Sequence, residues 1–164
     1  MMRDFLARTP TADDFRAVVG GPANSFNGIF EARVQADAAL RALLHPIVQG
    51  EPVRTVDDCA LWVLLLHLAD VTESLAMPSS TGALHKLTAG DGQDGLLSDT
   101  LTAYFDAAGS TDSAARALHI HPNTMRYRMR RIREISGLDF DDADALLLAQ
   151  LQIRVNALLA TRNQ

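Results

Sequence analysis

The stretch SAARALHIHPNTMRYRMRRIREISG, from Ser113 to Gly137, decides how the fold of this 164-residue sequence is interpreted. Between Arg116 and Arg133 it contains six arginines, with no lysine and no acidic residue. The whole chain has 15 Lys+Arg against 20 Asp+Glu, so its formal net charge is −5. The window therefore carries +6 and the rest of the chain −11. An acidic protein thus gathers much of its positive charge in one short segment.

The order of residues in this stretch predicts two short helices joined by a tight turn. The first is expected from about Asp112 to Leu118, and the second from Pro122 to about Ile135. Proline is favoured at the first position of a helix and glycine just after its end, where Gly137 stands. At about 100° per residue, three apolar side chains of the second helix share one narrow face. They are Met125, Met129 and Ile132, and they are expected to pack on Ala115, Leu118 and Ile120.

The opposite face of the second helix is basic and polar. It presents Asn123, Thr124, Tyr127, Arg130, Arg131 and Glu134, with Arg126 at its edge. Two helices, a tight turn and a second helix with such a face are typical of a helix-turn-helix. Because a DNA duplex carries about one negative charge per 1.7 Å, its partner needs local positive charge whatever its total charge. Arginine suits this task, since its planar fork pairs bidentately with phosphate or with guanine.

Other interpretations of the reactive side chains find less support. The plain alternative for an arginine run is a solvated helix face, which explains neither the turn nor Pro122. His119 and His121 have no cysteine or acidic cluster around them, so the sequence predicts no metal site and no cofactor. Cys59 lies in an apolar run and is expected to be an inert core thiol. No catalytic constellation has a defensible spacing in the sequence, so an enzyme is not predicted.

The composition of the chain favours a mainly α fold. Hydrophobic residues make up 48% and aromatic residues 5%, and the helix formers Ala and Leu are abundant. We expect helices over about 27–44, 57–76, 96–109 and 141–160, and at most two short strands, within 14–21 and 51–56. The segment 77–95 is rich in turn-forming residues and is expected to be a connection with one helical turn near Leu84–Leu87. The predicted parts are a small helical region (1–77), a linker (78–94) and a helix-turn-helix domain (95–164).

The sequence also favours a cytoplasmic homodimer. Its N-terminus has no long apolar run, and the longest apolar run, CALWVLLL, is far shorter than the about 20 residues of a membrane span. A single cysteine excludes an internal disulfide and favours a reducing compartment. The last helix is apolar on more than one side, which predicts a partner surface. In a homodimer, two recognition helices read half-sites about 34 Å apart.

Beyond these patterns, residues 96–159 resemble the C-terminal helix-turn-helix domain of the PucR/CdaR family of bacterial transcriptional regulators. HPNTMRYRMRRI is the most specific part of this match, and the domain is related to that of the Fis nucleoid protein. The segments VVGGPANSFNGIFEARVQADAALRAL and VRTVDDCALWVLLLHL resemble the end of the GGDEF-like domain that precedes it in these regulators. The GGDEF signature itself is absent from the sequence. The resemblance thus implies a Fis-like DNA-binding domain after a truncated dimerisation region.

The resemblance also implies which side chains contact DNA. The side chains it implies near base edges are His121, Asn123, Thr124 and Tyr127. The side chains it implies mostly on phosphates are Arg126, Arg128, Arg130 and Arg131. Arg130 is also able to reach into the groove. Arg128 ranks below the others, because the helical wheel points it sideways towards the packed flank. Position 119 is often glycine in helix-turn-helix turns generally, so His119 departs from that wider pattern.

We therefore predict a sequence-specific DNA-binding transcriptional regulator that inserts the helix Pro122–Ile135 into the major groove of double-stranded DNA. The alternative is a protein-interaction or dimerisation module without specific DNA recognition, in which the arginine helix docks on an acidic partner. The sequence identifies neither an operator nor an effector.

Overall fold

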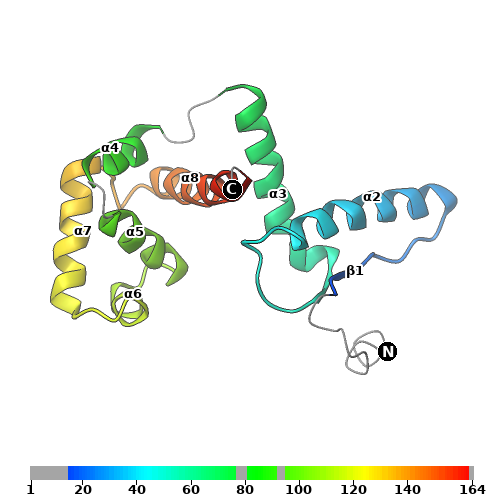
Figure 1. The fold of residues 1–164 in the computed structure, drawn as a ribbon, viewed down its shortest axis with the longest axis horizontal. Helices are drawn as coiled ribbons and strands as arrows, with labels where there is room; N and C mark the ends of the chain where they lie inside the picture. Colours follow the sequence, from blue (N-terminus) through cyan, green and yellow to red (C-terminus); the bar gives the residue numbers. More distant parts are fainter. Residues whose placement is uncertain (1–14, 77–80, 92–94, 163–164) are drawn as a thin grey trace. The chain divides into compact units, whose positions relative to one another are not determined.

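The computed structural model describes residues 15–76, 81–91 and 95–162. Of residue 162, only the backbone is described. Its contacts divide the chain into two compact units, residues 1–73 with 158–164 and residues 74–157, and each unit is described by itself. Both are built mainly of helices, and one small sheet lies in the first unit (Figure 1). The mainly α fold class that the sequence predicts is confirmed.

The first unit alternates two strands with two helices. These are β1 (Ala17–Val19), α2 (Phe26–Leu43), β2 (Val53–Thr55) and α3 (Val56–Ser74). The strands pair in parallel, with Ala17 opposite Val53. A parallel pair needs a crossover connection, which α2 supplies. The strands lie inside the two stretches predicted to be extended, and the helices begin and end within about two residues of their predicted bounds.

Local hydrogen bonds explain where both helices begin. The Ser25 hydroxyl accepts a hydrogen bond from the Gly28 amide at 3.0 Å and so caps α2. At α3, the Thr55 amide donates to the Asp58 carboxylate at 2.9 Å, and the Asp58 amide donates to the Thr55 hydroxyl at 3.2 Å. This reciprocal pair is a capping box, which satisfies two amides that have no partner within the helix.

The first unit has a small core and a large exposed apolar surface. Its buried side chains include Ala39, Leu43, Val48 and Cys59, and Trp62 packs against them. On its two helices, the large apolar side chains that stay exposed are Phe26, Ile29, Phe30 and Val34 of α2 and Leu61, Leu64, Leu68 and Val71 of α3. Two strands and two helices therefore leave one face of each helix uncovered within the part of the chain that is described.

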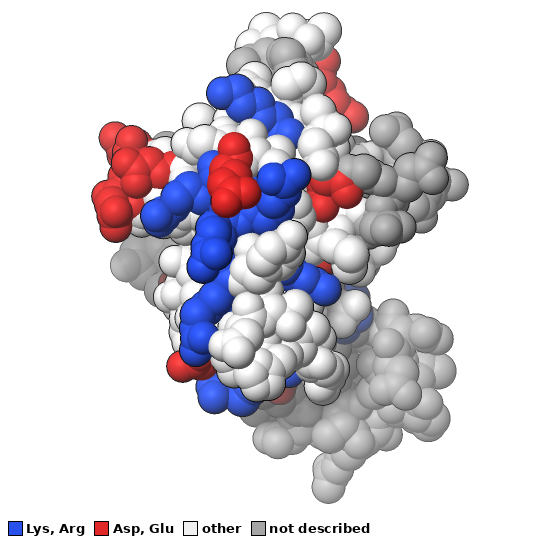
Figure 2. Space-filling model, turned by 90° about the vertical axis from the view of Figure 1, so that its left-hand side faces the viewer, with Lys and Arg blue, Asp and Glu red and all other residues white. Residues whose placement is uncertain are grey.

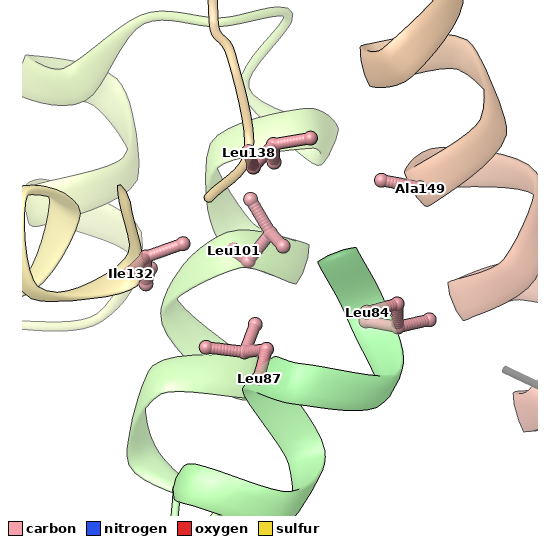
Figure 3. Close-up of a cluster of buried hydrophobic side chains, with 6 residues drawn as sticks. All are labelled: Leu84, Leu87, Leu101, Ile132, Leu138 and Ala149. Carbon is pink, nitrogen blue, oxygen red and sulfur yellow. The ribbon is translucent and has the colours of Figure 1, made fainter. Parts of the chain in front are cut away.

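The second unit is a cluster of short helices. They are α4 (Gly82–Gly90), α5 (Leu96–Asp106), α6 (Thr111–Ala117), α7 (Pro122–Ser136) and α8 (Ala143–Arg162), whose last residues belong to the first unit. Figure 3 shows six buried side chains gathered between them, namely Leu84, Leu87, Leu101, Ile132, Leu138 and Ala149. The removal of these apolar side chains from water is the main force that holds the helices together.

Helix α4 is longer than the sequence predicts. One turn near Leu84–Leu87 is expected within a connection, whereas the helix has nine residues and buries both leucines. Its last residue, Gly90, lies so close to α7 that a Cβ there would be 2.6 Å from Cγ2 of Ile135. The surrounding Gly, Ser and Thr signal turns locally, but a helix this short is stabilised by tertiary packing, which a local pattern does not reveal.

Helix α5 begins at a cap that is distant in sequence. The Asp91 carboxylate accepts hydrogen bonds from the amides of Leu97 at 2.8 Å and Ser98 at 2.7 Å. A carboxylate at this end also interacts favourably with the positive pole of the helix dipole. The residue that follows α4 therefore determines where α5 starts.

Helix α8 is long and apolar enough, by length and composition alone, to cross a membrane, and it is the one described helix for which this holds. Within Ala143–Thr161, 17% of the apolar window that meets this criterion is buried. Core helices of soluble proteins have the same length and composition. Ala149 lies in the core of the second unit, and Val155 and Leu158 are also buried, so we describe α8 as a packed helix.

Candidate nucleic-acid interface

The turn between α6 and α7 is a Schellman motif, in which the last carbonyls of a helix find partners beyond its end. The His119 amide donates to the Arg116 carbonyl at 3.1 Å, and the Ile120 amide donates to the Ala115 carbonyl at 3.0 Å. His119 has a φ of 54°, the left-handed conformation that favours glycine. The histidine therefore occupies the left-handed position that follows the C-cap of α6.

Helix α7 begins at a cap formed by His121. Its Nδ1 accepts a hydrogen bond from the Asn123 amide at 3.2 Å, and Pro122 occupies the first helical position. With Nδ1 as acceptor, the neutral ring carries its proton on Nε2. Gly137 ends the helix with a φ of 69°, and its amide donates to the Arg133 carbonyl at 2.9 Å. The start and stop signals read from the sequence are both confirmed.

The apolar face of α7 packs on two different partners. Met125 is buried with Ala114 and Ala115 of α6, and Leu118, Ile120 and Met129 pack around them, as predicted. The prediction for Ile132 is wrong: it belongs to the other core cluster, with Leu87 of α4 and Leu101 of α5. At about 1.5 Å per residue, the 15-residue α7 is roughly twice as long as the seven-residue α6. Its second half therefore extends beyond α6 and needs another helix to cover it.

The other face of α7 is open to solvent along its length. All seven candidate contact residues are exposed: His121, Asn123, Thr124, Arg126, Tyr127, Arg130 and Arg131. Tyr127 is a large ring that stays 64% exposed. Figure 2 shows Lys and Arg side chains in a band along this side of the second unit, with acidic side chains beside it. A single helix thus presents amide, hydroxyl, aromatic and guanidinium groups on one surface.

Contacts within this surface orient some of its members. Nη1 of Arg126 donates to Oδ1 of Asn123 at 2.6 Å, which leaves the amide NH2 of Asn123 as its outward donor. Arg131 forms an ion pair with Glu134 at 3.2 Å, and both side chains are about half exposed. An exposed pair of this kind contributes at most about 1 kcal/mol, so a phosphate can displace the carboxylate. Among the described residues, Arg130 has no such partner.

The remaining arginines of the window point elsewhere. Nη1 of Arg128 donates to the buried Thr100 hydroxyl at 3.3 Å, so this side chain lies on the packed flank, as the helical wheel indicates. The Arg133 guanidinium lies over the ring of Phe140, 5.4 Å from its centroid. Arg116, on α6, donates to the Ser113 hydroxyl at 3.0 Å. The sequence assigns no individual role to Arg116 or Arg133, because neither contact is visible before the chain is folded.

Two helices, a tight turn and a second helix with an exposed basic face define a helix-turn-helix module, and the fold predicted for this stretch is confirmed. Residues 97–155 match the family described as the PucR C-terminal helix-turn-helix domain. This part of the chain is therefore similar to the PucR C-terminal helix-turn-helix domain.

Curated proteins extend the similarity. An uncharacterized protein of Mycobacterium tuberculosis (strain H37Rv) is 31% identical over 132 residues, which are 79% of this chain and 27% of that protein. The carbohydrate diacid regulator of Escherichia coli is 38% identical over 63 residues, 38% of this chain and 16% of the regulator. The DNA-binding transcriptional activator AdeR of Bacillus subtilis is 30% identical over 57 residues, 35% of this chain and 14% of AdeR. The chain thus spans about a quarter of the length of the mycobacterial relative.

Proposed function

We propose that this chain acts as a sequence-specific DNA-binding transcriptional regulator whose recognition helix, α7, enters the major groove. One observation carries the proposal: the exposed face of α7 gathers Asn123, Tyr127 and Arg130 on the outer side of a helix-turn-helix. A major groove is wide enough for one α-helix and displays a distinct pattern of donors and acceptors for each base pair. The match to the PucR C-terminal domain supports the same function.

Within this proposal, each side chain has a role that suits its chemistry. Asn123, with its NH2 directed outward, reads an acceptor on a base edge, and Thr124, Tyr127 and His121 line the same edge. Arg126 and Arg131 bind phosphates, which position the helix without reading sequence. Arg130 has no partner among the described residues, so it is free to reach guanine in the groove. The proposal assigns the chain no catalytic step.

We also propose that the first unit is the end of a GGDEF-like domain and that the protein is a cytoplasmic homodimer. The alternation β1, α2, β2, α3 with a parallel strand pair fits the end of an α/β domain. The uncovered apolar faces of α2 and α3 fit a domain whose other layers lie outside the described residues. On α8, Leu147 and Leu148 are exposed and offer a surface for a second copy. Two copies would bring two recognition helices to a pair of half-sites.

A protein-interaction module is the second candidate function. Phe26 and Phe30, one turn apart on α2, are 89% and 69% exposed. Large exposed apolar patches mark interaction surfaces in soluble proteins. In this alternative the surface of α2 holds a partner, and α7 binds nucleic acid without specificity or not at all.

Fluorescence anisotropy on duplex DNA from upstream of the protein's own gene tests the proposed function. We expect the logarithm of the association constant to fall linearly with the logarithm of salt concentration. Asn123→Ala and Arg130→Ala should weaken specific binding by about 1–3 kcal/mol each and reduce discrimination against scrambled DNA. Arg131→Gln should weaken binding to both DNAs and reduce the salt slope by about 1.

The matched control is Arg33→Ala, which removes an exposed arginine of α2 that pairs with Asp37. It should leave both affinities unchanged. Equal affinity for the upstream and the scrambled duplex, together with a defined protein bound to the α2 surface, would favour the interaction module instead.

A further inference from the structure

A small pocket opens on the flank of α7, within the second unit. Its volume is about 330 Å³, near the lower end of the range for small-molecule sites. The lining residues come from α5, α6, α7 and the segment between α7 and α8: Tyr104, Thr111, Met129, Arg130, Arg133 and Phe140. All of them belong to one unit, so the pocket is a property of the helix-turn-helix domain itself.

One wall of the pocket is aromatic and apolar. Tyr104 and Phe140 meet edge to face, with ring centroids 5.6 Å apart and an interplanar angle of 83°. Met129 completes this wall with a polarisable thioether, and its side chain is half-buried. Flat, apolar groups pack well on rings and sulfur in such an arrangement. The wall therefore suits the ring of a small ligand.

The pocket also carries positive charge that nothing in it neutralises. Arg130 and Arg133 line it, and no carboxylate does. Neither arginine forms an ion pair among the described residues, whereas Arg131 and Arg154 do. The stacking of Arg133 on Phe140 holds its guanidinium beside the aromatic wall. Thr111 belongs to the same lining, and its hydroxyl is an uncharged donor.

We infer that this pocket binds a small aromatic carboxylate. The ring lies against Tyr104, Phe140 and Met129, and the carboxylate accepts hydrogen bonds from Arg130 and Arg133. Guanidinium–carboxylate pairs are among the stronger hydrogen-bonded contacts in proteins, and a planar anion matches their fork. An inorganic anion would satisfy the two arginines but would leave the aromatic wall without a partner.

A consequence of this site rests on the proposed function. Arg130 belongs both to the pocket lining and to the surface proposed to contact DNA. A bound carboxylate therefore competes with DNA for the same guanidinium, and ligand and DNA should weaken each other's binding by the same factor. The pocket would then make DNA affinity responsive to a metabolite without any contribution from another domain.

Titration of ¹⁵N-labelled protein with sodium benzoate, followed by NMR in the absence of DNA, tests the site directly. We expect saturable shifts at Thr111, Arg133 and Phe140, with a dissociation constant in the low millimolar range. Benzyl alcohol, which lacks the charge, and acetate, which lacks the ring, should each bind at least about tenfold more weakly. Inorganic phosphate at equal ionic strength should also bind at least about tenfold more weakly than benzoate, because it lacks the ring.

Arg133→Met keeps the side-chain volume but removes the guanidinium, and it should weaken benzoate binding by about tenfold. Its matched control is Arg116→Met, which replaces an exposed arginine of α6 that does not line the pocket. The inference is wrong if benzoate gives no saturable shifts, if phosphate binds as well as benzoate, or if both variants bind benzoate like the native protein.

The competition is measured separately, by anisotropy of labelled DNA at constant ionic strength. Benzoate should weaken DNA binding by the native protein several-fold and have little effect on Arg133→Met. Because the NMR titration contains no DNA, benzoate binding by a protein that does not bind DNA would reject the proposed function alone. Benzoate binding with unchanged DNA affinity would reject the coupling between the two sites.

Discussion

His119 lies where the chain turns from α6 into α7, with a φ of 54°. A residue with a Cβ is strained by about 1–2 kcal/mol in this conformation, because the Cβ crowds the following carbonyl. The amides of His119 and Ile120 both donate to carbonyls of α6, so the surrounding hydrogen bonds hold the strained residue in place. The imidazole itself is exposed, and its replacement removes no packing contact in the core.

We therefore expect His119→Gly to raise the free energy of unfolding by up to about 1 kcal/mol. Glycine relieves the strain. The larger conformational entropy of glycine in the unfolded chain offsets about 0.5–1 kcal/mol of this gain. The control is Ala117→Gly, because Ala117 has the ordinary helical conformation of α6. This change should lower the free energy of unfolding by about 1 kcal/mol. Urea denaturation measures the free energy of unfolding of both variants. Equal destabilisation by the two variants would show that His119 is not strained.

Cys59 gives a second prediction for a single side chain. Burial raises the pKa of its thiol above the ordinary value of 9.0; nearby Arg54 opposes this rise and Asp58 adds to it. The neutral thiol thus stabilises the fold below pH 9, and this contribution is lost as pH increases through the raised pKa. At neutral pH, iodoacetamide should modify the folded protein at least about tenfold more slowly than the protein unfolded in urea. Similar rates in the two states would show that the thiol is accessible.

At the scale of helices, α4 packs against α7. Leu87 of α4 is fully buried beside Ile132 of α7, and Gly90 allows the two helices to approach closely. The match to the PucR domain begins at residue 97, after α4 has ended. The second unit therefore includes a helix that lies outside the matched segment but contributes to the same core.

Leu87→Ala should lower the free energy of unfolding of the second unit by about 2–5 kcal/mol, because it leaves a cavity in a closely packed core. Lys86→Ala, at the exposed neighbouring position, should change it by no more than about 0.5 kcal/mol. Chemical denaturation followed by circular dichroism distinguishes the two variants. If both changes were small, α4 would not be part of the cooperative core.

At the scale of the whole molecule, apolar surface and charge are distributed unequally. The chain has a net charge of −5, yet α7 exposes Arg126, Arg130 and Arg131 on one side. Leu147 and Leu148 on α8 and Phe26 and Phe30 on α2 are exposed apolar side chains, and large apolar patches mark interaction surfaces. Association with a second copy would bury such surface, and the acidic remainder of the chain would disfavour incorrect docking on DNA.

We expect light scattering after size exclusion, at tens of micromolar protein, to give twice the 17.8 kDa mass of one chain. A double variant with Leu147→Ser and Leu148→Ser removes two exposed leucines of α8 and should shift the protein towards monomer. The control is Leu44→Ser, which removes a leucine of similar exposure just after α2. A monomer at all concentrations would reject the homodimer.

Much of the helix-turn-helix could be predicted from the sequence, because its determinants act over a few residues. Pro122 and Gly137 bound α7, and helical periodicity separates Met125 from the exposed arginines. The same periodicity correctly turned Arg128 towards the packed flank. Capping preferences and a repeat of 3.6 residues need no knowledge of the rest of the chain.

Other features were decided only by the tertiary structure, because they join residues that are far apart in sequence. Asp91 caps α5 across an intervening segment, Ile132 packs on α4 and α5 rather than on α6, and α4 is stabilised by a core that its own residues cannot form. The pocket likewise needs Tyr104 and Phe140 to meet beside Arg133. Such contacts depend on how helices pack, and packing is set by the shapes of all the partners together rather than by any local pattern.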